Sequence, residues 1–176
     1  MLLGAHQSIA GGVHLALGRA EADGCECLQI FTTHNTRWAP RPLPDEESSL
    51  FWSEAARLEL PVFSHASYLI NLASPDWSQR ARSLEALHDE LRRCETLGLL
   101  GTVLHPGSHM GEGEEAGLRR IARELGELHR LTPGFRARVL LENTAGQGNG
   151  LGSDFAHLGR LLADTHQGDR LGVCID

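Results

Sequence analysis

Long apolar runs are missing from this sequence of 176 residues. No stretch approaches the roughly 18 consecutive apolar residues that a membrane helix needs. The N-terminal segment 1–6 has no basic residues ahead of an apolar run, so no secretory signal is expected. The four cysteines lack the spacing of a small disulfide-stabilised domain, which predicts free thiols. We therefore expect a cytoplasmic protein that does not contact a membrane.

Positive charge is also scarce, because the formal net charge is −7. This is the wrong sign for a protein that binds nucleic acid by bulk electrostatic attraction, and it counts mildly against nucleic-acid binding. Any binding to DNA must therefore depend on local cations or on bound metal ions. No linker or low-complexity stretch interrupts the chain, and its composition is ordinary for a globular protein. We expect residues 1–176 to form a single domain.

Short apolar runs alternate with segments of helical period. The runs that predict strands are Leu2–His6, Cys25–Phe31, Leu60–His65, Gly101–His105, Ala137–Glu142 and Leu171–Asp176. Apolar residues at helical spacing lie between them, as in 13–20, 84–97 and 118–128. Asp76 and Asp154 are expected N-caps, and Gly24, Gly98 and Gly168 are expected helix ends. The alternate prolines of segment 39–44 predict an extended loop.

This order of six strands and five helices predicts a parallel sheet covered by helices. A doubly wound open sheet and a (β/α)₈ barrel both have this pattern. No G-x-G-x-x-G and no G-x-x-x-x-G-K-[ST] motif follows the first strand, which removes the best support for a nucleotide-binding open sheet. A barrel needs eight β/α units. The fold class we predict is an α/β, TIM-type barrel, incomplete by its last helix and two units.

Four of the predicted strands end in potential metal ligands. His65, His105, Glu142 and Asp176 follow one another at about 35–40 residues, the length of one β/α unit. The carboxyl ends of parallel strands share one rim, so the four side chains should converge there. Two imidazoles and two carboxylates suit zinc, manganese or iron. Each residue alone is more simply a loop or capping residue, but four in succession favour a metal site.

The segments that follow these strand ends extend the pattern. His105–His109 is a proline/glycine turn with a second histidine, and Glu142–Gly148 is a polar loop whose glycines permit close approach to a ligand. In the loop after His65, Tyr68 and Leu69 either cover the edge of the barrel or act as a wedge into a base stack.

With Gly4–His6, Phe31-Thr32 and Gly172–Asp176, these motifs resemble the endonuclease IV family along the whole chain. The resemblance implies a zinc-dependent (β/α)₈ barrel that cleaves DNA on the 5′ side of abasic sites during base excision repair. Those enzymes hold two or three zinc ions, and we keep manganese as an alternative.

The resemblance also assigns roles to single residues. It implies that His65 and His105 bind one zinc ion, that Glu142 bridges two ions and is the catalytic carboxylate, and that Asp176 binds the second. The nucleophile would be metal-bound water. The partner would be double-stranded DNA with abasic sites, contacted by Tyr68, Leu69 and, more weakly, Arg37, and the protein would be a monomer.

Two features depart from the family pattern. The segment Phe31–Trp38 lacks the usual lysine and carries its arginine, Arg37, one place nearer to Trp38. The family continues from the motif of Asp176 into Thr-Cys-His and further ligands. The 176 residues do not contain them, so we expect this chain to lack the third zinc site and some ligands of the second. We expect the 176-residue chain to be unstable or inactive in isolation, because the outermost strands leave open sheet edges.

Two other hypotheses remain. The first is a metal-dependent sugar isomerase or epimerase, since barrels of that chemistry use similar ligands at strand ends. The second is a catalytically inactive truncated remnant that binds metal or DNA weakly.

Overall fold

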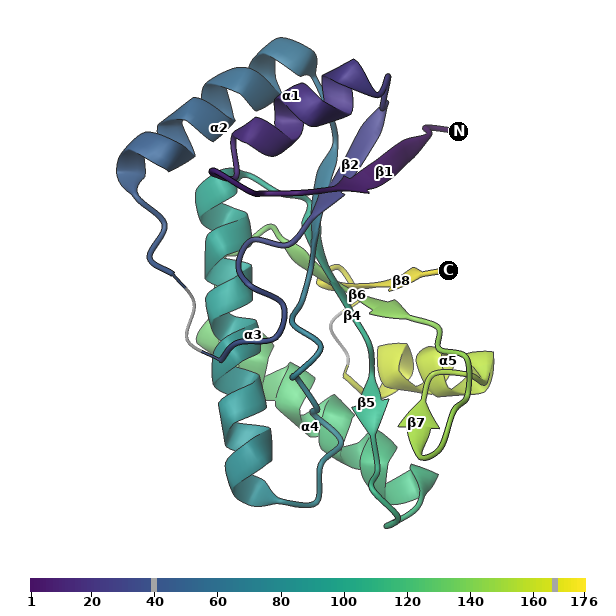
Figure 1. Cartoon of the computed structure of the whole chain (residues 1–176). Coiled ribbons are helices and arrows are strands. Elements are labelled where there is room, and N and C mark those ends of the chain that lie inside the picture. Colours follow the sequence, from purple (N-terminus) through teal and green to yellow (C-terminus); the bar gives the residue numbers. More distant parts are fainter. Residues whose placement is uncertain (39–40, 166–167) are drawn as a thin grey trace.

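The computed structural model of the chain describes residues 1–38, 41–165 and 168–176. Its main sheet has six strands in the order β1-β2-β3-β4-β6-β8, with every neighbouring pair parallel. These strands are β1 (Gly4–Gln7), β2 (Cys27–Ile30), β3 (Val62–His65), β4 (Gly101–Leu104), β6 (Arg138–Glu142) and β8 (Leu171–Cys174). The helices between them are α1 (Leu15–Ala22), α2 (Asp45–Leu58), α3 (Trp77–Leu97), α4 (Glu114–Leu131) and α5 (Phe155–Asp164). The predicted alternation is confirmed, and the strands follow chain order as in a partial TIM-type barrel (Figure 1).

Local sequence signals account for several helix ends. Asp76 accepts hydrogen bonds from the backbone amides of Ser78 and Gln79 at the start of α3, as an N-cap does. Asp154 caps α5 in the same way. Gly98 ends α3 in the left-handed conformation (φ 69°) that glycine adopts without strain. The expectation for Gly168 was wrong, because α5 already ends at Asp164.

The loop predicted for segment 39–44 is only partly within the described residues. Ala39 and Pro40 lie outside them. Pro44 has extended backbone (φ −66°, ψ 146°) and directly precedes α2, as predicted for a residue that cannot continue a helix.

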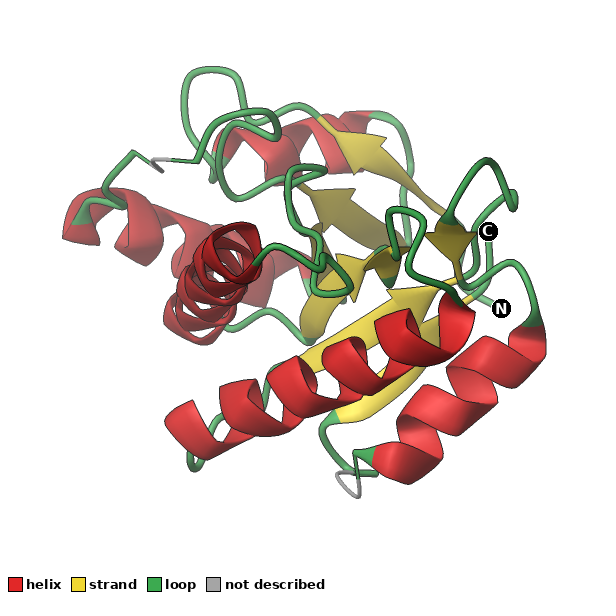
Figure 2. Cartoon of the chain, turned by 90° about the horizontal axis from the view of Figure 1, so that it is seen from below, coloured by secondary structure: helices red, strands yellow, loops and turns green. Residues whose placement is uncertain are grey.

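The two faces of the sheet differ in what covers them. On the outer face, residues such as Ile30, Leu104 and Leu141 are at most 2% exposed and belong to one core with the helices. Figure 2 shows the helices lying along the outside of the curved sheet. On the inner face, Val103 and Leu140 line an open cavity with residues of β1, β2 and β8. The helices therefore pack against the outer face. The inner face is open, and it ends at the rim formed by the carboxyl ends of the strands.

A second, smaller sheet was not predicted. Gly107–Ser108 (β5) pairs antiparallel with Gly150–Leu151 (β7), just beyond the ends of β4 and β6. The amide of His109 extends the ladder by donating to the carbonyl of Asn149 (3.0 Å). The segments after His105 and Glu142 are therefore fastened together.

None of the helices in the described part of the chain is long and apolar enough to span a membrane.

Candidate metal centre

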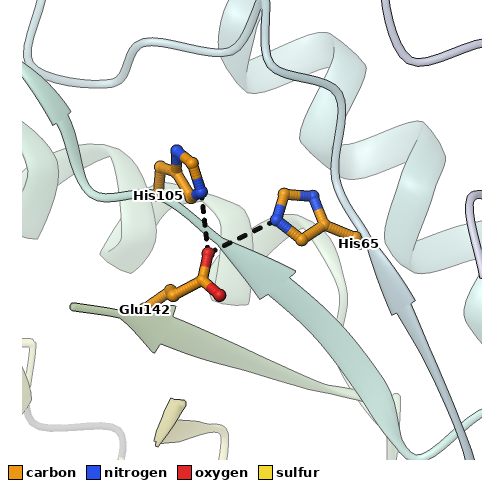
Figure 3. Close-up of side chains that lie close together, drawn as sticks. All are labelled: His65, His105 and Glu142. Carbon is orange, nitrogen blue, oxygen red and sulfur yellow. Dashed lines mark hydrogen bonds and ion pairs between the residues drawn. The ribbon is translucent and has the colours of Figure 1, made fainter. Parts of the chain in front are cut away.

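Three of the four predicted ligands come together at the rim. His65 is the last residue of β3, Glu142 is the last residue of β6, and His105 directly follows β4. Glu142 Oε2 lies 2.7 Å from His105 Nε2 and 3.4 Å from His65 Nε2. Figure 3 shows the two imidazoles turned toward this carboxylate from neighbouring strands. One ligand atom from each residue lies within 4.8 Å of the other two.

Strand alternation explains the convergence. His65 stands beside Val103 in the β3–β4 ladder, and Glu142 lies two residues after Leu140 on β6. Val103 and Leu140 are register partners that point to the inner face. Because side chains alternate along a strand, His65 and Glu142 also point inward, and His105 continues the alternation beyond Val103. The three side chains therefore meet above the inner face.

The hydrogen bonding of His65 makes this group suitable for a cation. Its Nδ1 lies 2.7 Å from the carbonyl oxygen of Ala66. A carbonyl only accepts, so Nδ1 must carry a proton, and in the neutral ring Nε2 then carries a lone pair. That lone pair faces the Glu142 carboxylate at 3.4 Å, an arrangement that needs a proton or a metal ion between the two. A carbonyl partner that fixes the tautomer is also typical of metal-binding histidines.

The three side chains differ in their exposure to solvent. The side chains of His65 and Glu142 are 7% and 11% exposed, whereas that of His105 is 47% exposed. The centre is therefore fixed on the side of the sheet and open at His105, where a ligand from solvent has access.

Asp176 stands apart from this group. It follows β8 at the same rim, but its carboxylate is not among the atoms that lie together, and the residue is exposed. Its backbone is held by Asn143, whose Oδ1 accepts from the Asp176 amide (2.7 Å) and whose Nδ2 donates to the Asp176 carbonyl (3.2 Å). The prediction that Asp176 binds a second metal ion stays a prediction.

Cys174 lies next to the centre but outside the group of three. Its Sγ is 4.0 Å from Glu142 Oε1. Burial, and then the negative charges of Glu142 and Asp176, raise the pKa of the Cys174 thiol. The residues whose ligand atoms group together are His65, His105 and Glu142, a set of nitrogen and oxygen ligands.

The predicted DNA-contacting residues lie in the loops around the centre. Tyr68 is 56% exposed, and its ring centroid lies 5.1 Å from that of His65 and 5.6 Å from that of His105. Leu69 follows it, half-buried, and lines a surface pocket with Tyr68 and His105. Arg37 is exposed in the loop after β2. The structure places all three at the rim, and their role in binding DNA stays a prediction.

One site residue that the sequence did not reveal is Asn71. Its Oδ1 accepts from the amides of Ala73 (3.0 Å) and Ser108 (2.9 Å), and its Nδ2 donates to the Ser108 carbonyl (3.0 Å). This side chain therefore joins the loop after His65 to the loop after His105. Gly107, with φ 121°, is required beside it, because a Cβ there would lie 2.5 Å from Asn71 Oδ1. A polar amide within an apolar loop was the only signal in the sequence.

Phe31 is a second residue that the sequence analysis did not assign to the centre. Its ring lies 4.5 Å from that of His6, 5.4 Å from that of His65 and 5.7 Å from that of Tyr68. It therefore connects the rim of β1 and β2 to the metal-binding side chains.

Comparison with known proteins agrees with this arrangement. A family model described as a xylose isomerase-like TIM barrel matches residues 17–176, and the chain belongs to this family. Solved structures of the same fold include a D-tagatose 3-epimerase-like protein, with a TM-score of 0.78 over 100% of this chain and 65% of that one. At 18% identity, that likeness shows the fold alone.

Within the family, the chain is more similar to endonucleases. It is 44% identical over 176 residues to a protein of Geobacter sp. (strain M21) named "Probable endonuclease 4", covering 99% of this chain and 62% of that protein. The crystal structure of endonuclease IV from Thermus thermophilus matches with a TM-score of 0.87 at 36% identity, over 100% of this chain and 62% of that one. The chain thus spans about three fifths of the length of these relatives.

Proposed function

We propose that this chain forms part of a metal-dependent deoxyribonuclease that hydrolyses the phosphodiester 5′ to abasic sites during base excision repair in the cytoplasm. The products would be a 3′-hydroxyl and a 5′-deoxyribose phosphate. The observation that carries the proposal is the group of His65, His105 and Glu142, in a chain 44% identical to a protein named as an endonuclease. We take residues 1–176 as one barrel domain of a monomeric protein.

The donor set supports zinc as the metal. Two imidazole nitrogens and one carboxylate oxygen are common ligands of catalytic zinc, which keeps one position open. When bound, the metal supplies a Lewis acid that polarises a phosphoryl oxygen and lowers the pKa of a coordinated water. In our proposal Glu142 and Asp176 would together hold a second ion.

The residues of this chain have separate tasks in the proposed reaction. His65 and Glu142 are held rigidly by burial, so the position of the scissile phosphate is set by the sheet. His105, whose side chain is 47% exposed, would face the approaching duplex. Tyr68 and Leu69 would fill the gap in the base stack at the lesion, because an abasic nucleotide leaves no base to displace. The metal would supply the positive charge that a chain of net charge −7 lacks.

The test uses a hybrid barrel, in which residues 1–176 replace the matching part of the Geobacter relative. We expect zinc-dependent nicking of an abasic duplex, little nicking of an intact duplex, and loss of nicking after chelation. Epimerisation of free D-tagatose is the alternative arm, because epimerases share the fold. Turnover of the ketose without nicking would overturn the nuclease proposal, as would nicking that survives both chelation and Glu142→Gln.

A further inference from the structure

Helix α3 carries two charged residues on the side that packs against the sheet. Glu90 is 4% exposed, and its burial raises the pKa of the carboxyl group. Arg93, one turn later, is half-buried, and desolvation lowers the pKa of its guanidinium. Charged groups placed in this way cost free energy unless polar partners compensate them. Neither residue belongs to the metal centre, so their presence at this buried position calls for another reason.

Their partner is the start of the loop that follows β2. Arg93 Nε donates to Thr32 Oγ1 (2.9 Å), and Arg93 Nη2 donates to the Thr32 carbonyl (2.6 Å). Thr32 Oγ1 in turn donates to Glu90 Oε2 (2.7 Å). Thr32 is 2% exposed, so its backbone and side chain are held within the protein from two directions.

The same guanidinium reaches the other end of the loop. Arg93 Nη1 donates to the carbonyl of Arg41 (3.0 Å). One side chain therefore joins Thr32 and Arg41, which flank the described segment 33–38. Three acceptors on two residues, each bonded to a different nitrogen, suit a planar guanidinium, whereas a lysine ammonium is a compact point charge on a flexible stem.

The segment held in this way lies against the metal centre. Phe31, which precedes Thr32, contacts the rings of His65 and Tyr68. Ser67, beside Tyr68, donates to the carbonyl of Asn35 (2.7 Å). Arg37 and Arg93 also line a common crevice between this loop and α3. A shift of Thr32 would therefore move both an aromatic neighbour of the metal centre and the exposed Arg37.

We propose that Arg93 is a positioning residue that closes the loop after β2 at both ends, with Glu90 orienting Thr32, and thereby holds Arg37 and Phe31 at the rim of the metal centre. The consequence for an abasic duplex rests on the proposed function. The effect on the loop itself does not.

The chain offers a direct test of the loop. Residues 1–176 contain 16 arginines and no lysine, so within them trypsin cleaves only after arginine, and Arg41 is protected because Pro42 follows it. Cleavage after Arg37 therefore reports how often the loop opens. In the hybrid barrel, we expect Arg93→Met to accelerate cleavage after Arg37 by about tenfold or more, as for a segment that opens locally. Cleavage after Arg138, within β6, measures global unfolding and should stay within about twofold of the original rate.

A matched control lies next in sequence. Arg92 is on the same helix, its side chain is 63% exposed, and it pairs with Asp89 at 3.6 Å. Arg92→Met should leave cleavage after Arg37 unchanged, and Arg93→Lys should give an intermediate rate. Equal rates after Arg37 in Arg93→Met and the original chain would overturn the proposal. A parallel rise after Arg138 would also overturn it, because Arg93 would then stabilise the fold as a whole.

The second readout uses the hybrid barrel. We expect Arg93→Met to raise KM for an abasic duplex several-fold, while kcat and zinc content stay unchanged. If the loop opens but KM does not change, the positioning of Arg37 toward the duplex is refuted. If the original hybrid shows no nicking, the proposed function fails, and the trypsin experiment still decides the role of Arg93 in the loop.

Discussion

The two faces of the six-stranded sheet differ in what packs against them. Leu141 and Leu140 are neighbours on β6, yet Leu141 is fully buried under the helices while Leu140 lines the open inner cavity. The outer face is a close-packed layer of leucine, isoleucine and valine. The inner face and its rim carry polar and aromatic groups, among them His65, His105 and Glu142. The metal-binding group lies at the rim formed by the carboxyl ends of the strands, where TIM barrels carry their catalytic residues, whereas the packed layer lies along the outer face.

The largest effect should come from Glu142→Gln, which tests whether the rim does chemistry without supporting the fold. Glutamine keeps the shape but removes the charge that faces both imidazoles. Loss of partners outside the ligand set commonly costs 10–100-fold in metal affinity, so loss of a ligand should cost more than about 100-fold. Zinc titration of the hybrid barrel measures affinity, and its nicking of an abasic duplex measures activity.

The melting temperature without metal separates the two roles of this residue. It should stay the same or rise, because a buried carboxylate is removed. A large drop in the metal-free melting temperature would mean that Glu142 supports the fold. The proposed contrast between a stabilising outer layer and a functional rim would then fail for Glu142.

The next prediction compares Leu141→Ala with Leu140→Ala. A fully buried leucine replaced by alanine costs about 2–5 kcal/mol, because transfer and cavity terms add. Leu140 faces an open cavity, so its truncation should cost less than about half as much. Urea unfolding of the two variants measures the difference. Equal losses would show that the inner face is packed as firmly as the outer one.

The sequence predicted the parts of this contrast that depend on periodicity. Strand alternation and the spacing of β/α units were enough to bring His65, His105 and Glu142 to one rim. Caps such as Asp76 and Asp154 were also recognisable, because their preference for helix starts has a local cause.

The remainder depends on contacts between loops, which no local pattern encodes. The β5–β7 pair consists of two-residue strands in glycine-rich segments, too short for any periodicity. Asn71 and Arg93 act through hydrogen bonds to backbone groups far along the chain. Nothing in the sequence distinguishes an asparagine or arginine with such a role from any other. The carboxylate of Asp176 was expected in the cluster from its strand position, but its neighbour Asn143 holds only its backbone.

A third prediction concerns a polar residue within the packed layer. His129 on α4 is 5% exposed, and neither of its ring nitrogens has a hydrogen-bond partner among the described residues. Burial, and then the charge of Arg170, lower the pKa of His129 to about 4. The unfolded chain binds this proton at about 6.5. The folded state should therefore lose stability as pH falls from about 6.5 to 4, by at most about 3 kcal/mol, and none above that window.

The measurement is the free energy of unfolding against pH for the original chain and for His129→Leu. Carboxylates titrate in both proteins, so the difference between the two curves isolates the histidine. We expect that difference to grow in favour of the leucine variant as pH falls through the window. A difference that stays flat from pH 7 to 4 would show that His129 reaches water or a proton acceptor.

The smallest effect on the fold, and the most selective one on function, is expected from replacing Tyr68 and Leu69 together with alanine. Tyr68 is exposed and contacts the rings of Phe31, His65 and His105, so its removal opens no cavity in the leucine layer. We expect a melting temperature within about 2 °C of the original, as for surface changes of under about 0.5 kcal/mol. Stacking on an aromatic side chain is worth about 1–3 kcal/mol per base, so affinity for an abasic duplex should fall by roughly tenfold or more.

Selectivity is the decisive quantity for Tyr68 and Leu69. A wedge acts where a base is missing, so the hybrid barrel should lose more affinity for abasic than for intact duplex. Trp77 provides the control, because it is an exposed aromatic residue (73%) in the first turn of α3. Among the described residues, it takes no part in the ring contacts around the centre. Trp77→Ala should leave both affinities unchanged. Equal losses of affinity on the two duplexes would mean that Tyr68 and Leu69 only pack the barrel edge. The functional role of the rim would then be limited to the metal ligands.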